Sequence, residues 1–145
     1  MAIRKLAIAG GILFALCLAC DDSPSEPSLF PSSFEATYTR VRDCRFSIDH
    51  GGTSITVWAS PEGAAAYQAG TYPLPANTVL VKKLHTDAAC KELDGFVAMK
   101  KDASDSWAWQ ALDKSGSATG PDTPRTCITC HNDCTEGRDS TCTDP

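Results

Sequence analysis

The residues with the clearest capacity for chemistry are Cys127, Cys130 and His131, which stand in the segment Cys-Ile-Thr-Cys-His. Cys-x-x-Cys-His is the attachment sequence of c-type haem, in which each thiol adds to one of two vinyl groups on the same macrocycle. The adjacent imidazole can then reach the iron as its proximal ligand. We therefore predict one covalent haem c held by Cys127 and Cys130, with His131 bound to the iron.

Two less specific interpretations of this segment stay open. The first is a disulfide within Cys-x-x-Cys beside an incidental histidine, and the second is half of a zinc site. Zinc usually takes four ligands, and His50 and His85 are the only other histidines of the chain. An export signal would favour haem attachment over both alternatives.

The N-terminus has the features of such a signal. Arg4 and Lys5 precede an uncharged run that extends from Leu6 to Ala19. A run of about fourteen residues is too short to span a bilayer and is typical of the hydrophobic region of a signal peptide. We therefore expect residues 1–19 to be a signal peptide.

The end of this run resembles a bacterial lipobox. It reads Leu-Ala-Cys, so that Cys20 would be acylated and become the first mature residue, although Cys17 stands where leucine is usual. Ordinary cleavage after Ala19 without a lipid is the alternative. A lipid on Cys20 would anchor the protein to a membrane without a spanning helix. The expected location is the cell envelope of a Gram-negative bacterium, with the protein facing the periplasm.

The charge of the chain indicates which partners it can have. The 145 residues carry a formal charge of −5, which becomes −7 once Arg4 and Lys5 leave with the signal. Basic residues are neither in excess nor clustered, which argues against a nucleic-acid partner. A cationic redox protein or a small neutral ligand fits an acidic surface better.

The remaining cysteines indicate disulfides. Of eight cysteines, four have no role in export, lipidation or haem attachment: Cys44, Cys90, Cys134 and Cys142. An even remainder in an exported protein indicates two disulfides with three alternative pairings. Because Cys134 and Cys142 bracket a short polar loop, we expect them to pair, which leaves Cys44 with Cys90. Free thiols, the alternative, do not suit an oxidising compartment.

The rest of the chain predicts a single small domain. Residues 20–31 are polar and proline-rich, as in a flexible tether, and the haem domain would then span 32–145. A capping box at Ser32–Glu35 and apolar residues at helical spacing predict a helix over 33–43. A second helix begins at Ser60-Pro61 and stops at Gly70.

Four segments have the β-branched, alternating pattern of strands. They cover residues 54–59, 78–85, 96–100 and 107–112, and the last two form a hairpin with Trp107 and Trp109 on one face. The predicted fold class is α+β, with an antiparallel sheet of about four strands, short helices and a C-terminal Cys-x-x-Cys-His segment that binds haem.

Two consecutive lysines occupy the second of these strands. Alternation places Lys82 on one face and Lys83 on the other, so one of them points the same way as apolar neighbours. Such a lysine is usually solvated near a strand end. The alternative is a lysine directed into a pocket, where burial would lower its pKa.

The order of several segments resembles a known family. Tyr-Pro-x-Pro at 72–75 is followed by Thr-Val-Leu-Val-Lys-Lys, then Phe-Val-Ala-Met-Lys-Lys at 96–101, Asp-Ser-Trp-Ala-Trp at 105–109 and finally Cys-x-x-Cys-His. This order is similar to that of the cytochrome P-460 family, which includes the cytochromes c′-β, over roughly residues 34–134. The resemblance implies a small, sheet-rich monohaem fold, often dimeric, with His131 proximal and a distal side that is open or capped by apolar residues.

The resemblance also implies a choice of activities. Some members oxidise hydroxylamine, and others bind nitric oxide or carry electrons. In the hydroxylamine-oxidising members a lysine is linked to the macrocycle, and Lys82 and Lys83 both lie in the matching segment. The chain departs from the family pattern by adding Cys134 and Cys142 after the haem motif, which suggests a tail pinned by a disulfide.

Three functions follow as hypotheses. We expect a lipid-anchored c-type cytochrome that binds a small ligand, such as nitric oxide, or transfers electrons. The alternatives are a haem oxidoreductase acting on hydroxylamine or a related nitrogen compound, and a disulfide-rich lipoprotein without haem.

The sixth iron ligand would separate the first two functions. Ligation by Met99, the only methionine of the mature chain, would give a low-spin electron carrier. His50 and His85 are the other candidates, although both are expected at the surface. On the resemblance, we expect a five-coordinate, high-spin iron.

Overall fold

The computed structural model describes residues 27–120, 125–134 and 137–142. Along the chain, the elements are η1 (Phe34–Ala36), β1 (Thr39–Ser47), η2 (Ile48–His50), β2 (Thr53–Ala59), α1 (Pro61–Gln68), β3 (Val79–His85), β4 (Leu93–Lys101), β5 (Trp107–Asp113) and α2 (Arg125–Asn132). Here η marks a single turn of 3-10 helix. Residues 1–26, with the expected signal peptide and Cys20, lie outside the described residues.

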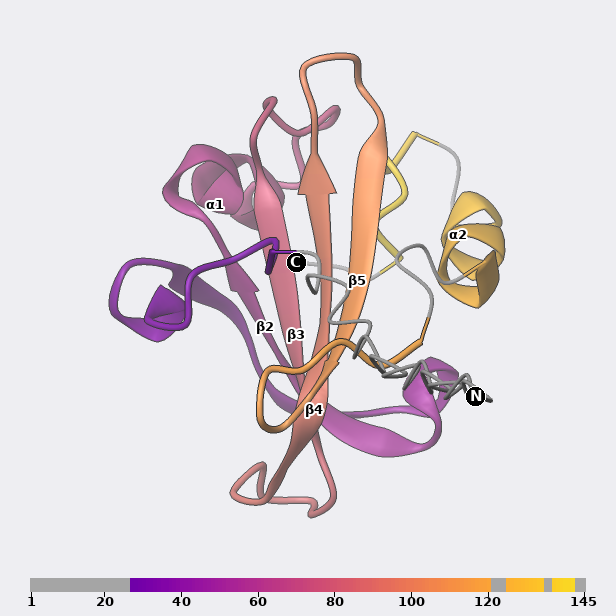
Figure 1. The fold of residues 1–145 in the computed structure, drawn as a ribbon. Helices are drawn as coiled ribbons and strands as arrows, with labels where there is room; N and C mark the ends of the chain where they lie inside the picture. Colours follow the sequence, from indigo (N-terminus) through magenta and orange to yellow (C-terminus); the bar gives the residue numbers. More distant parts are fainter. Residues whose placement is uncertain (1–26, 121–124, 135–136, 143–145) are drawn as a thin grey trace, which may run out of the picture.

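One antiparallel sheet forms the centre of the domain (Figure 1). Its five strands lie in chain order, β1-β2-β3-β4-β5, and each pairs with the next. The predicted antiparallel α+β fold is confirmed, with five strands where the sequence indicated about four. The four predicted strands correspond to β2, β3, β4 and β5, and the last two form the expected hairpin.

The predicted helix over 33–43 is wrong. The capping-box segment makes only the single 3-10 turn η1, and the chain then enters β1 at Thr39. β1 is an edge strand, and its pairing with β2 shifts register between Arg40 and Arg42 and again between Arg42 and Arg45. These irregularities disrupt the period-two alternation by which a strand is recognised, so the apolar residues happened to match a helical spacing.

The helix α1 begins and ends where the sequence predicted. Ser60 precedes it in an extended conformation and Pro61 occupies its first turn, where proline loses no hydrogen bond. Gly70, just beyond its end, has φ 63°, a conformation that glycine adopts without strain.

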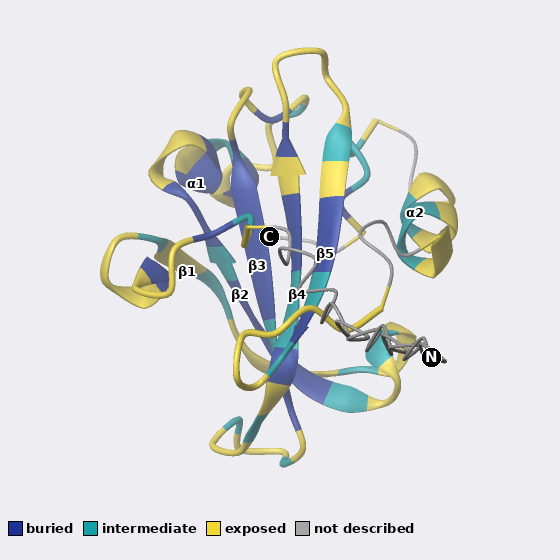
Figure 2. Ribbon diagram, viewed as in Figure 1, coloured by how far each residue is buried: buried dark blue, intermediate teal, exposed yellow. Residues whose placement is uncertain are grey.

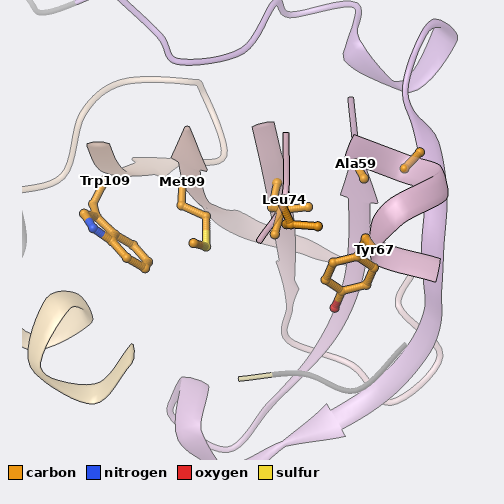
Figure 3. Packing of buried hydrophobic residues seen from close by; sticks show 7 residues of the cluster. Ala59, Tyr67, Leu74, Met99 and Trp109 are labelled. Atoms are coloured by element: carbon orange, nitrogen blue, oxygen red, sulfur yellow. The ribbon is translucent and has the colours of Figure 1, made fainter. Parts of the chain in front are cut away.

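The sheet has a different hydrophobic cluster on each face. On one face α1 and the loop before β3 cover a cluster that consists of Ala59, Ala64, Tyr67, Leu74, Leu80, Met99 and Trp109. Figure 3 shows Trp109 and Met99 projecting from adjacent strands to the same side, with Tyr67 at the opposite end of the cluster. Trp107, Cys127 and Ile128 pack against this cluster, so α2 lies on the same face. The predicted placement of Trp107 and Trp109 on one face is confirmed.

The segment before β1 covers the opposite face. Phe30 and Phe34 are buried there with Val79, Val81, Ala98 and Leu112. The backbone N–H of Leu29 donates to Gln110 Oε1 over 2.9 Å. Leu29 and Phe30 therefore pack against the sheet, within the segment that the sequence predicts to be a tether. The apolar pair Leu29-Phe30, read as part of a polar segment, was the signal that sequence analysis passed over.

Burial follows this arrangement. Figure 2 shows the most buried stretches on the inner strands, whereas the hairpin tips and much of β1 are exposed. An edge strand is hydrogen-bonded to a neighbouring strand on one side only. The disulfide between Cys44 of β1 and Cys90, in the loop before β4, ties this edge to the sheet, with Cα atoms 5.8 Å apart.

The second disulfide joins Cys134 to Cys142. Both expected pairings are thus confirmed. Among the described residues, no helix combines the length and the apolar character needed to cross a membrane.

Candidate functional site

The helix α2 carries the three residues of the Cys-x-x-Cys-His segment. Cys127 is partly buried against the Trp109 cluster, and Cys130 is exposed. Both thiols are free. The structure therefore does not contain the alternative, a disulfide between Cys127 and Cys130. Cys127 and His131, four positions apart, lie on the same side of the helix.

His131 is held in one orientation by two neighbours. Its Nδ1–H donates a hydrogen bond of 2.7 Å to the carbonyl oxygen of Ser140, which leaves Nε2 as the nitrogen that faces a potential metal. The ring packs edge-on against Trp109, with ring centres 4.6 Å apart. Burial lowers the pKa of His131, although the Ser140 carbonyl opposes this effect. The imidazole is therefore neutral near pH 7, which is the form that binds metals.

A cavity of about 570 Å³ lies beside α2. Its opposite wall comes from the end of β1 and from η2, and includes Phe46, Ile48 and His50. Phe46 and Ile48 are 64% and 76% exposed, the two large hydrophobic side chains that stand out as exposed in the described chain. The cavity has the size of a typical ligand pocket, and it exposes apolar surface that a bound group could cover.

A smaller apolar pocket adjoins this cavity and shares Cys127 and His131 with it. Met99 and Trp109 line the smaller pocket. Met99, the candidate sixth ligand, is thus buried near the histidine, inside the hydrophobic cluster (Figure 3).

Lys82 is the lysine that lines both spaces. It is only 8% exposed, and its Nζ lies 3.2 Å from His50 Nε2. Burial lowers the pKa of Lys82 to about 8, against the opposing effect of Asp49. Burial and the neighbouring Lys82 lower the pKa of His50 to about 4. A neutral His50, 2.8 Å from Ser47 Oγ through Nδ1, can therefore accept a hydrogen bond from Lys82.

Lys83 lies on the opposite face of the sheet. Its Nζ forms an ion pair of 2.8 Å with Glu35. His85 lies on that face too, buried, with Nε2 at 3.4 Å from Thr56 Oγ1. The expectation that both histidines are surface residues is therefore wrong for His85, whereas His50 is half-buried at the cavity wall. Of the two lysines left open by the sequence, only Lys82 shares a pocket with His131.

A zinc site fits these residues poorly. The ring of His131 lies close to the sulfur atoms of Cys134 and Cys142. Those two cysteines are bonded to each other, and a disulfide offers no thiolate to a metal.

The tail after α2 contains residues that the sequence did not single out. The carboxylate of Asp139 accepts hydrogen bonds from the Leu74 backbone, from Lys101 and from Trp107. The next residue, Ser140, provides the carbonyl that holds His131. The partners of Asp139 lie 32 to 65 positions away in sequence, so no local pattern could have revealed them.

No family model matches this sequence, and no curated protein matches it. The similarity to the cytochrome P-460 family therefore stays a prediction, carried by the order of the segments quoted above.

Proposed function

We propose that this protein is an exported, lipid-anchored c-type cytochrome with one covalent haem, which binds a small ligand of the nitric oxide type or transfers electrons. The observation that carries the proposal is the convergence at one cavity of two free thiols, Cys127 and Cys130, with a histidine whose Nδ1 is already engaged. Haem-ligating histidines have this arrangement, because a carbonyl at Nδ1 fixes the ring and leaves Nε2 for iron.

The residues around the cavity fit the group. Haem is a largely apolar plate, and the exposed side chains of Phe46 and Ile48 offer it apolar contact. Arg45 lines the same cavity and can pair with a propionate. Cys127 and Cys130 would hold the macrocycle and His131 would hold its iron.

In this proposal the haem and the polypeptide have different roles. Bound haem supplies an iron atom that can change oxidation state or take up a small ligand. The chain excludes water through Tyr67, Leu80 and Trp109. Lys82 and His50 place a polar pair at the cavity wall, where Lys82 can donate a hydrogen bond to a ligand. A cationic redox protein suits the acidic chain as its electron-transfer partner. We also propose that the protein forms a homodimer.

The test is to produce the protein with a cytochrome c maturation system and to record its intact mass and visible spectrum. We expect the mass of one haem added to the polypeptide, and a high-spin spectrum that shifts on addition of nitric oxide. The matched control, Cys127→Ser with Cys130→Ser, should lack covalent haem. A wild-type mass equal to that of the bare polypeptide would favour the disulfide-rich lipoprotein.

A second variant tests the sixth iron ligand. Met99→Leu removes the thioether and preserves the volume of the apolar cluster, so the spectrum should stay nearly unchanged. A low-spin wild type that becomes high-spin in Met99→Leu would identify Met99 as a ligand and the protein as an electron carrier.

The alternative function, oxidation of hydroxylamine or a related nitrogen compound, is favoured by one observation. Lys82 lies in the cavity beside Cys127 and His131, and its lowered pKa makes the nucleophilic neutral amine accessible near pH 8. A buried amine in this place suits the linkage between lysine and macrocycle that the resemblance implies for hydroxylamine-oxidising members.

A further inference from the structure

We propose that Asp139 is a positioning residue for the proximal histidine. Its carboxylate fixes the loop that presents the Ser140 carbonyl to His131 Nδ1–H, and it thereby sets how strongly His131 donates to a metal. The inference rests on the proposed haem function, because it describes the role of His131 as an iron ligand.

The first step is the anchoring of Asp139. Its Oδ2 accepts from Leu74 N–H over 2.8 Å and from Lys101 Nζ over 2.7 Å, and its Oδ1 accepts from Trp107 Nε1 over 3.2 Å. The Asp139 side chain is only 12% exposed. The donors come from the loop before β3, the end of β4 and the start of β5. Asp139 therefore ties the tail after α2 to the sheet and to the loop before β3.

The second step is the strength of this anchor. Lys101 is fully buried and forms ion pairs with Asp139 and with Asp105. Burial alone would lower the pKa of Lys101, but the two carboxylates raise it above its ordinary value. Lys101 is therefore a cation at neutral pH. Hydrogen bonds between ionised partners are about twice as strong as neutral ones, so the loop is held mainly at this point.

The third step is the connection from Asp139 to His131. Asp139 and Ser140 have φ values of 51° and 58°, a left-handed conformation that costs a non-glycine residue free energy. Such a turn persists only where its surroundings fix it. The hydrogen bonds of Asp139 fix one side, and the bond from Thr141 N–H to the Arg138 carbonyl (2.9 Å) with the Cys134–Cys142 disulfide fixes the other. The result is a carbonyl 2.7 Å from His131 Nδ1.

This carbonyl has a chemical effect on the ring. An acceptor at Nδ1–H gives the imidazole more anionic character and makes Nε2 a stronger donor. A stronger proximal donor stabilises ferric over ferrous iron and so lowers the reduction potential. Releasing the loop should weaken this effect while His131 itself stays intact.

The test compares Asp139→Asn with Asp105→Asn in the haem-loaded protein. Each variant removes one carboxylate from Lys101, but Asp105 is 75% exposed and lies outside the loop. In Asp139→Asn we expect an upward shift of the reduction potential and a lower iron–histidine stretching frequency in the ferrous protein. Asp105→Asn should leave both values at those of the wild type. Unchanged values in both variants would overturn the inference.

Two further arms keep the test decisive. Trp107→Phe removes the donor to Oδ1, keeps an aromatic ring against the hydrophobic cluster and leaves the Asp139 carboxylate with Lys101. It should shift both readouts in the same direction by a smaller amount, even where Asp139→Asn does not fold. In the Cys127→Ser, Cys130→Ser polypeptide, nitrogen NMR should report a single Nδ1–H tautomer for His131, and a mixture once Asp139→Asn is added. A wild-type protein without covalent haem would reject the proposed function alone. A single Nδ1–H tautomer of His131 that persists in Asp139→Asn would reject the role of Asp139.

Discussion

Three lysines on adjacent strands illustrate how neighbours decide the chemistry of a side chain. Lys101 is buried between two carboxylates, and the pKa of its ammonium is raised. Lys83 pairs with Glu35. Lys82 is buried beside an imidazole, and its pKa is lowered to about 8. The sequence could place Lys82 and Lys83 on opposite faces, but which face carries the cavity depends on where α2 packs.

The first prediction at this scale compares Lys82→Ala with Lys83→Ala in the haem-loaded protein. Lys82 lines the cavity with Cys127 and His131, whereas Lys83 lies on the opposite face of the sheet. Lys82→Ala should therefore shift the Soret band and Lys83→Ala should not. The mass of the haem peptide adds a second measurement. A mass explained by two thioethers alone would place the protein with ligand-binding cytochromes and exclude a linked lysine, and equal spectra for both variants would contradict the cavity assignment.

The second prediction concerns pH and the free energy of unfolding of the haem-free Cys127→Ser, Cys130→Ser polypeptide. The pKa of Lys82 is about 8 in the folded wild-type chain, and its ordinary value is 10.5. Cys127 and Cys130 raise the folded value, so replacing them with serine keeps the pKa of Lys82 lowered. The unfolded state therefore binds more protons between these values, so this lysine makes stability rise with pH from 8 to 10.5 and destabilises the fold by about 3 kcal/mol below pH 8.

Urea unfolding at pH 7 and pH 10 measures this effect, with Lys82→Met as the matched variant. Lys82→Met should be more stable at pH 7 and should lose that advantage toward pH 10. If the free energies of unfolding of the two proteins change by the same amount between pH 7 and pH 10, the pKa of Lys82 is not lowered in the folded state.

At the scale of elements, regular segments were predictable and irregular ones were not. Strands with unbroken alternation, such as β3, and a helix with proline in its first turn, α1, were found from local pattern alone. β1 was missed because its two register shifts put arginines and apolar residues out of period. Leu29 and Phe30 pack against partners in β4 and β5, such as Phe96 and Gln110. These partners are far away in the sequence, so a local sequence pattern could not predict the contacts.

The prediction at this scale concerns the edge strand β1. The Cys44–Cys90 disulfide closes a separation of 46 residues, so removing it with two serines should lower the free energy of unfolding by about 4 kcal/mol in the chain-entropy account. Urea unfolding of the oxidised protein provides the measurement. Cys134→Ser with Cys142→Ser, which opens a separation of 8 residues, should lower stability less, by about 2–3 kcal/mol. The reverse order would show that the tail, and not the edge strand, limits stability.

At the scale of the whole molecule, the two faces of the sheet have different roles. One face is closed by an aromatic cluster in which Phe30, Phe34 and Phe96 are in mutual contact. The other face carries α2, Lys82 and the cavity. The sequence predicted both disulfides from residue type and spacing, and the haem site at Cys127, Cys130 and His131 stays a prediction from the same kind of pattern. The sequence could not predict the closing of the first face by residues 27–38, because that packing joins distant parts of the chain.

This separation leads to the last prediction, which concerns the expected lipid anchor. Cys20 precedes the described domain, whose packed residues include Leu29 and Phe30 on the face opposite the cavity. Cys20→Ser should therefore move the protein from the membrane fraction to the soluble periplasmic fraction without changing its haem spectrum. Metabolic labelling with a fatty acid, followed by fractionation, measures the first effect, and absorption spectroscopy measures the second. A wild-type protein that takes up no fatty-acid label would reject the lipobox interpretation. A changed haem spectrum would instead show that the segment before residue 27 contributes to the site.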